Sequence, residues 1–208
     1  NILKMYVDEN VLNFMDNREY ETAITANETV QASVVFIDIC GFTAISESVS
    51  AEKVVHLLNH YFDVMVKEII ELDGHVDKFI GDAIMAVFKG EYHLDRAIDA
   101  CLAVRNKIND LPKFMEGADY TPKVSIGINK GEMISGNIGS ASLKRLDYTV
   151  IGNTVNTAQR LQSAAEPGQI LIQESAYEEV KDSFNCKKVG DKNLKNKSEP
   201  ITVYEVLD

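Results

Sequence analysis

The sequence predicts an α+β fold, in which helices pack on one face of a sheet. Residues 32–38 form an apolar run rich in β-branched side chains, which is typical of a buried strand. Residues 54–72 instead repeat apolar side chains every 3.6 residues, which is typical of an amphipathic helix. Strands and helices alternate without regular βαβ spacing, and this favours an α+β sandwich.

The other elements follow from the same two periods. We expect a helix to open at Ser50 and to end at Asp73-Gly74, followed by a hairpin with Gly81-Asp82 at its tip. The hairpin arms are 75–79 and 84–88. The later expected elements are a helix over 94–111, strands over 122–129, 133–138 and 147–151, a helix over 154–165, a strand over 169–173, a short helix over 175–182 and a strand over 201–206.

Two units are expected along the chain. Residues 1–29 comprise an amphipathic helix over 2–15 and a polar linker, which together form a regulatory connection. Residues 30–208 form the main domain. Because the chain starts at Asn1 and not at Met, we expect an upstream sensor or membrane domain in a longer protein.

Composition excludes several classes of protein. The 208 residues carry a net charge of −11, which would repel a nucleic-acid backbone, so no nucleic acid is expected as a partner. There is no apolar run of about 18 residues and no signal peptide. Three widely spaced cysteines fit a reducing compartment, so a cytoplasmic location is expected. Five lysines between Lys187 and Lys197 form either a solvated loop or a local grip for an anion.

Two aspartates stand among apolar, strand-like residues. Asp38 ends the first strand and Asp82 lies at the hairpin tip, so both carboxylates project at one sheet edge if the strands are neighbours. Such carboxylates are costly to bury without a cation, and Mg²⁺ is commonly held by one or two carboxylates together with substrate phosphates. The backbone carbonyl of Ile39 could complete the set. The alternative is that each aspartate caps a turn.

The segment after Asp38 is a candidate phosphate cradle. It leads toward a helix start, where backbone N–H groups, those of Phe42 and Thr43 among them, could bind a triphosphate. A P-loop is excluded because the sequence has no GxxxxGK[ST] element. Cys40 lies in the same loop, where its pKa could fall, although a plain packed thiol is the favoured interpretation.

A second polar segment lies at residues 145–161. Asn153-Thr154 is expected to cap a helix on which Asn156 and Arg160 share one face. An amide and a guanidinium so placed can bind a ribose and a phosphate, although such pairs are often simple surface hydrogen bonds. His56 and His60 have zinc-ligand spacing but lack the intervening Glu, so a surface pair is favoured.

Three motifs together resemble the catalytic domain of class III nucleotidyl cyclases. They are residues 36–43 (FIDICGFT), 77–83 (DKFIGDA) and 151–160 (IGNTVNTAQR), and the resemblance extends over about residues 30–206. It implies a ferredoxin-like palm sheet and a head-to-tail homodimer with sites at the interface. It also implies two Mg²⁺ or Mn²⁺ ions. The roles that it implies are metal binding for Asp38, Asp82 and the Ile39 carbonyl, base recognition for Lys78 and Thr149, ribose orientation for Asn156, transition-state stabilisation for Arg160, and phosphate binding for Lys195 with Lys192 or Lys197 as substitutes.

The base-recognition pair favours ATP as the substrate. Thr149 stands where many adenylyl cyclases have Asp, which resembles the subgroup that includes soluble, bicarbonate-responsive cyclases. Guanylyl cyclases of the family typically have Glu at the position of Lys78. Adenine offers an acceptor at N1 for the Lys78 ammonium and a donor at N6 for the Thr149 oxygen. The sequence therefore predicts an adenylate cyclase that makes cyclic AMP and pyrophosphate.

Other activities are weaker alternatives. A guanylate cyclase is one. A degenerate cyclase-like module that binds nucleotide without turnover is another, although no expected site residue is missing. A diguanylate cyclase would want a Gly-Gly-Asp/Glu-Glu-Phe turn where this chain has Ile80-Gly81-Asp82-Ala83.

Overall fold

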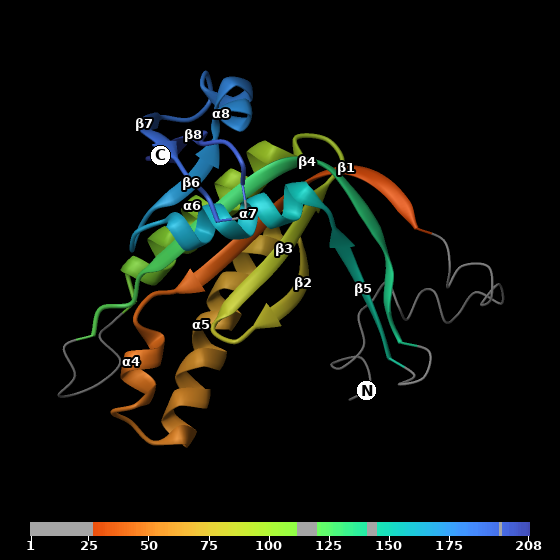
Figure 1. The fold of residues 1–208 in the computed structure, drawn as a ribbon. Coiled ribbons are helices and arrows are strands. Elements are labelled where there is room, and N and C mark those ends of the chain that lie inside the picture. Colours follow the sequence, from red (N-terminus) through yellow and green to blue (C-terminus); the bar gives the residue numbers. More distant parts are fainter. Residues whose placement is uncertain (1–26, 112–119, 141–144, 196) are drawn as a thin grey trace.

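The computed structural model describes residues 27–111, 120–140, 145–195 and 197–208. The expected helix over residues 2–15 and the linker up to residue 26 lie outside these described residues. Within them, the chain forms a mixed sheet with helices on both of its faces (Figure 1).

The described strands form one sheet in the order β2-β3-β1-β4-β6-β8-β7, with β5 paired to β4 outside this path. Neighbouring strands are antiparallel except for β4 and β6, which run parallel. The strand bounds are β1 Glu28–Ile39, β2 His75–Ile80, β3 Ala83–Lys89, β4 Val124–Ser140, β5 Arg145–Ile151, β6 Ile170–Gln173, β7 Cys186–Lys192 and β8 Ile201–Val206.

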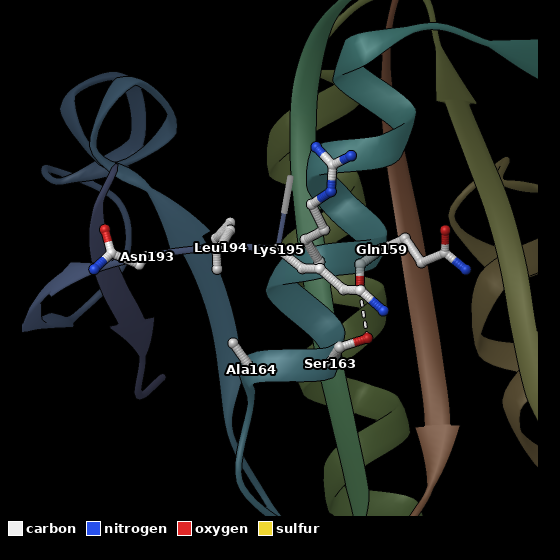
Figure 2. Close-up of a pocket in the computed structure, with 7 residues that line it drawn as sticks. Gln159, Ser163, Ala164, Asn193, Leu194 and Lys195 are labelled. Carbon is white, nitrogen blue, oxygen red and sulfur yellow. Dashed lines mark hydrogen bonds between the residues drawn. The ribbon is translucent and has the colours of Figure 1, made fainter. Parts of the chain in front are cut away.

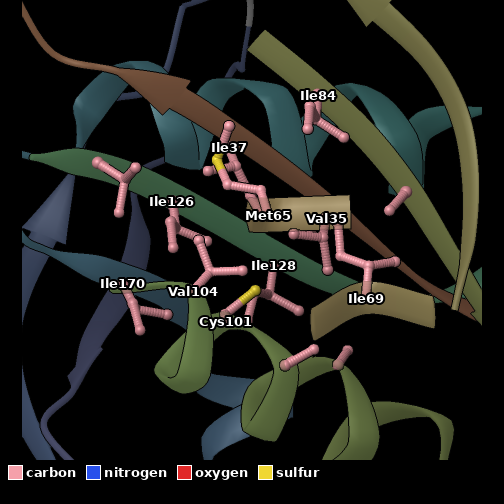
Figure 3. Packing of buried hydrophobic residues seen from close by; sticks show 14 of the residues in the cluster. Val35, Ile37, Met65, Ile69, Ile84, Cys101, Val104, Ile126, Ile128 and Ile170 are labelled. Atoms are coloured by element: carbon pink, nitrogen blue, oxygen red, sulfur yellow. The ribbon is translucent and has the colours of Figure 1, made fainter. Parts of the chain in front are cut away.

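The larger core lies between the sheet and two long helices. Alternate side chains of β1, such as Val35 and Ile37, face α5 and α6, and Figure 3 shows Met65 of α5 and Val104 of α6 packing toward them. The helices are α4 Phe42–Ser46, α5 Ala51–Glu71, α6 His93–Asn109, α7 Asn153–Ala164 and α8 Glu174–Val180. Helix α5 begins as expected at Ser50, whose side chain accepts a hydrogen bond from the Lys53 backbone N–H.

The expectation that all helices lie on one sheet face is wrong for α7. The intervening β1 side chains, Val34 and Phe36 among them, point to the opposite face and pack with Val155 and Ala158 of α7. The reason is that β1 is apolar on both faces, so that each face must be covered. Helix α7 consequently lies on the same face as the Asp38 side chain, since residues 34, 36 and 38 alternate in step along β1.

Two strands differ from the expectations. The expected strands over 122–129 and 133–138 are one continuous strand, β4, which passes through Gly131 in a left-handed conformation with φ of 147°. Strand β7 was not expected at all, because its mostly exposed sequence CKKVGDK lacks an apolar alternation. Among the described strands it pairs with β8 alone, and lysines are common on such edge strands.

Candidate active site

The two aspartates lie at neighbouring strand ends. Asp38 is opposite Ala83 in the pairing of β1 with β3, and Asp82 precedes Ala83 in the β2–β3 turn. The Ile39 backbone N–H donates to the Asp82 carbonyl oxygen at 3.3 Å, which ties the two segments together. The adjacency that the sequence suggested is therefore present in the fold.

The Asp38 carboxyl is electrostatically strained by this arrangement. Its pKa rises from the ordinary value of 3.8 to about 7, first because burial disfavours the charged form and then because the Asp82 side chain hydrogen-bonds to it and repels its charge. A cation between the two carboxylates would remove both penalties. The pair with a backbone carbonyl is an all-oxygen donor set that suits Mg²⁺ or Mn²⁺.

Other metal arrangements find no support in the described residues. No group of three or more His, Cys, Asp or Glu side chains gathers there in a metal-binding arrangement. That finding gives no support to a zinc site at His56 and His60. Burial raises the pKa of the Cys40 thiol, so the suggestion of a lowered pKa is wrong and the packed-thiol interpretation is favoured.

In the candidate phosphate cradle, Phe42 can offer a ligand only its backbone, whereas Thr43 can also offer its side chain. Gly41 adopts a left-handed conformation with φ of 72° and turns the chain from β1 into α4. The Phe42 side chain is buried in the larger core, so only its backbone can face a ligand, whereas Thr43 is exposed. The Tyr120 hydroxyl donates to the Cys40 carbonyl at 3.0 Å and steadies the turn.

Helix α7 carries Asn156 and Arg160, and its start differs in detail from the expectation. The N-cap is Gly152 without a side-chain cap bond, and Asn153 is already the first helical residue. The Thr154 hydroxyl instead donates to the Glu132 carbonyl of β4 at 2.8 Å. This bond fastens the helix to the sheet, so Thr154 positions α7 through β4.

Three further contacts hold α7 in register on β4. The buried Asn129 amide donates to the Thr154 carbonyl at 3.1 Å, and Gln162 Nε2 donates to Ser125 Oγ at 3.1 Å. Gly127 lies so close to the helix that a Cβ atom there would collide with the backbone of Ala158 and Gln162. These contacts position the helix face that holds Asn156 and Arg160.

Arg160 and Lys195 line the same cavity, of about 510 Å³. Figure 2 shows Lys195 in the chain segment that passes beside α7, near Gln159 and Ser163. Lys192 and Lys197 do not line this cavity, which favours Lys195 among the three lysines. The volume of this cavity falls in the range of small-molecule sites, about 300–1,000 Å³. Two cations in one cavity make it suited to an anionic ligand.

The two expected base-recognition residues meet at a third residue, Asp77. Thr149 Oγ1 donates to Asp77 Oδ2 at 2.7 Å, and Lys78 Nζ lies 3.5 Å from the same oxygen. Strand β2 has a register shift between Val76 and Lys78 in its pairing with β3. Such a bulge re-aims a side chain and explains how the consecutive residues 77 and 78 reach one another.

Asp77 was not singled out from the sequence. Its side chain is only 3 % exposed, although the aspartate directly precedes Lys78 in the DKFIGDA motif. An unexpected acidic residue beside a predicted ligand-binding lysine is the signal that could have drawn attention to it. The contact also shows that β5, which pairs with the distal half of β4, returns to the vicinity of β2 (Figure 1).

The chain belongs to the adenylate and guanylate cyclase catalytic domain family. The family model matches residues 24–207, nearly the whole chain, and the mixed sheet with its packed helices is the fold of solved members. The class that the motifs suggested, a class III nucleotidyl cyclase catalytic domain, is thereby confirmed.

Individual relatives include cyclases for both nucleotides. An adenylate cyclase of Anabaena cylindrica is 36% identical over 194 residues, covering 88% of this chain and 38% of that protein. The solved adenylyl cyclase CyaB from P. aeruginosa is 34% identical with a TM-score of 0.82, covering 88% of this chain and 96% of that one. The guanylate cyclase domain of RhGC from Catenaria anguillulae, solved with GTP, is 25% identical with a TM-score of 0.77, covering 86% and 98%. This chain thus spans well under half of the Anabaena protein.

Among the described residues, no helix is long and apolar enough to cross a membrane.

Proposed function

We propose that this domain is an adenylate cyclase, which converts ATP to 3′,5′-cyclic AMP and pyrophosphate. The observation that carries the proposal is the pairing of Lys78 and Thr149 on one oxygen of Asp77, at 3.5 and 2.7 Å. A lysine ammonium can only donate hydrogen bonds. It therefore suits the acceptor N1 of adenine and opposes the N1–H of guanine.

Arg160, Lys195 and Asn156 would handle the rest of the substrate. Lys195 and Arg160 share the cavity beside α7, where their charges suit the triphosphate. Asn156 is exposed on the same helix, four positions before Arg160, and would orient the ribose. In the reaction the ribose 3′-oxygen attacks the α-phosphorus, loses its proton and forms the cyclic ester, while the bond to pyrophosphate breaks. Arg160 would stabilise the negative charge that develops on the transferred phosphoryl group.

Asp38, Asp82 and the Ile39 carbonyl would hold the two divalent ions. When bound, such ions lower the pKa of the attacking hydroxyl and neutralise phosphate charge. The raised pKa of Asp38 supports this role, because a bound cation would stabilise the charged form of the carboxylate pair. The backbone N–H groups of Phe42 and Thr43 would contact the phosphates nearby.

The active form would be a head-to-tail homodimer. Apolar side chains that stay exposed in the single chain support this assembly, because a protein normally buries such residues against a partner. They lie on β2 and on the β4–β5 hairpin, close to the base-recognition residues, and are Phe79, Ile80, Ile134, Ile138 and Ile151. An upstream sensor or membrane segment and a cytoplasmic location stay predictions of the sequence.

The decisive experiment compares ATP and GTP as substrates with Mg²⁺ and with Mn²⁺. We expect cyclic AMP as the main product, with kcat/KM for ATP exceeding that for GTP by about one to two orders of magnitude, the cost of an unpaired buried polar group. Lys78→Glu should relax or invert this preference. Lys67→Glu makes the same charge change at an exposed position on α5 and should leave the preference intact. Equal or greater turnover of GTP by the unmodified protein would contradict the adenylate assignment.

Mixing inactive variants tests the shared site. Asp38→Ala lacks the metal carboxylate and Arg160→Ala lacks the phosphate-binding guanidinium, so a mixed dimer would contain one intact site. We expect the mixture to regain activity. Mixing Asp38→Ala with Asp82→Ala is the matched control, because both lesions fall in the same half-site and no intact site can form. Failure of the first mixture, despite demonstrated subunit exchange, would refute the interface arrangement.

A further inference from the structure

One oxygen of Asp77 accepts a hydrogen bond from Thr149 and forms an ion pair with Lys78. Thr149 Oγ1 is 2.7 Å from Asp77 Oδ2, and Lys78 Nζ is 3.5 Å from the same atom. Burial raises the pKa of Asp77, but the positive charge of Lys78 beside this oxygen lowers it and favours the ionised carboxylate, which can only accept hydrogen bonds. The proton between Oγ1 and Oδ2 therefore belongs to Thr149, which donates to the carboxylate.

The bond leaves Thr149 with lone pairs only. A hydroxyl has one proton to donate, and here the proton points at Asp77. Whatever approaches the other side of Oγ1 must then be a donor. The side chain of Asp77 is 3 % exposed and Thr149 is 6 % exposed, so water has little access through which it could replace this bond.

We propose that Asp77 is a specificity-determining residue, which locks the Thr149 hydroxyl as an acceptor and so makes the site reject purines with an oxygen at position 6. The inference rests on the proposed function, since it assigns Thr149 to the 6-position of the base. The 6-amino group of adenine donates to the fixed oxygen. The 6-oxo group of inosine or guanine would instead meet it acceptor to acceptor.

A purely structural role for Asp77 makes a different prediction. Burial raises the pKa of Asp77, whereas the Thr149 hydroxyl and the Lys78 ammonium lower it. These two residues therefore stabilise the charged carboxylate, and the carboxylate in turn fixes their positions. If Asp77 served only to stabilise the fold, its loss would weaken all nucleotides alike. If it acts on the polarity of Thr149, its loss will change discrimination at position 6.

The test compares ATP with inosine triphosphate, which has an oxygen at position 6 and lacks the 2-amino group of guanine. The ratio of kcat/KM for ATP to that for inosine triphosphate is measured in wild type, Asp77→Ala, Thr149→Val and the double variant. We expect Asp77→Ala to lower this ratio by about tenfold, because the freed hydroxyl can rotate and donate to the 6-oxygen. In the Thr149→Val background the same substitution should change the ratio by less than about twofold.

Asp77→Asn supplies a conservative rescue. Its amide oxygen must face Lys78 and Thr149, since turning the NH₂ group toward the ammonium would oppose two donors. We therefore expect this variant to keep most of the wild-type ratio. Circular dichroism and the melting temperature of each variant show whether it is folded. Binding of the α,β-methylene analogues of both nucleotides gives the same ratio without turnover.

Each outcome bears either on the role of Asp77 or on the adenylate cyclase assignment. An unchanged ratio in folded Asp77→Ala would overturn the role of Asp77 while the adenylate assignment stands. An equal drop with and without the Thr149 hydroxyl would also overturn it, because the effect would then act through Lys78. A wild type that makes no cyclic AMP, or prefers 6-oxo purines, would instead refute the proposed function.

Discussion

Replacing Asp38 with asparagine should make the metal-free protein more stable at pH 8 while abolishing turnover. The pKa of Asp38 in the folded chain is about 7, compared with the ordinary 3.8. The folded state therefore keeps a proton on this carboxyl over a pH range in which the unfolded chain has lost it. Its contribution to the free energy of unfolding is fully present below pH 3.8 and is lost as pH rises toward 7.

The size of the effect follows from the shift in pKa. A rise from 3.8 to about 7 corresponds to roughly 4 kcal/mol at full value, at 1.36 kcal/mol per unit. Because Asp38 is only half-buried, solvent screens part of this penalty. We therefore expect the wild type to lose about 2 kcal/mol of stability between pH 4 and pH 8 that the asparagine variant retains.

Urea unfolding in the presence of a chelator, repeated across this pH range, measures the difference. Asp63→Asn is the control, since Asp63 lies in an exposed pair with Lys67 and its replacement should change stability by less than about 0.5 kcal/mol at any pH. Adding Mg²⁺ should stabilise the wild type at pH 8 but not Asp38→Asn. Parallel pH curves for wild type and Asp38→Asn would refute the raised pKa of Asp38 in the folded chain.

Three further substitutions test how α7 and the cavity are held. Gly127→Ala should lower the melting temperature by several degrees and kcat by at least about tenfold, because the added Cβ would push α7 away from β4. A fully active Gly127→Ala variant would contradict this prediction. Asn129→Ala should cost about 1–3 kcal/mol in urea unfolding, since it removes the donor to the Thr154 carbonyl. Lys195→Ala should raise KM for ATP, whereas Lys192→Ala, outside the cavity, should leave KM unchanged in steady-state assays.

Much of the fold was predictable because it depends on short-range periodicity. The long helix α5, the hairpin of β2 and β3, and the buried strand β1 each have an apolar pattern that repeats within a few residues. The adjacency of Asp38 and Asp82 was also within reach, since both stand at the ends of strands with strong patterns. Strand β7 was missed because a lysine-rich edge strand lacks such a pattern.

The sequence by itself determined which residue types are available for chemistry: the two aspartates, the Asn156 and Arg160 pair, and Lys78 with Thr149. Only the tertiary structure decided that α7 covers the opposite sheet face from α5 and α6, and that Asp77 joins Lys78 to Thr149. The contact between Asp77 and Thr149 spans 72 positions of sequence and depends on a bulge in β2 and on the return of β5. Local patterns set the period of each element, but contacts between elements depend on how the whole sheet packs.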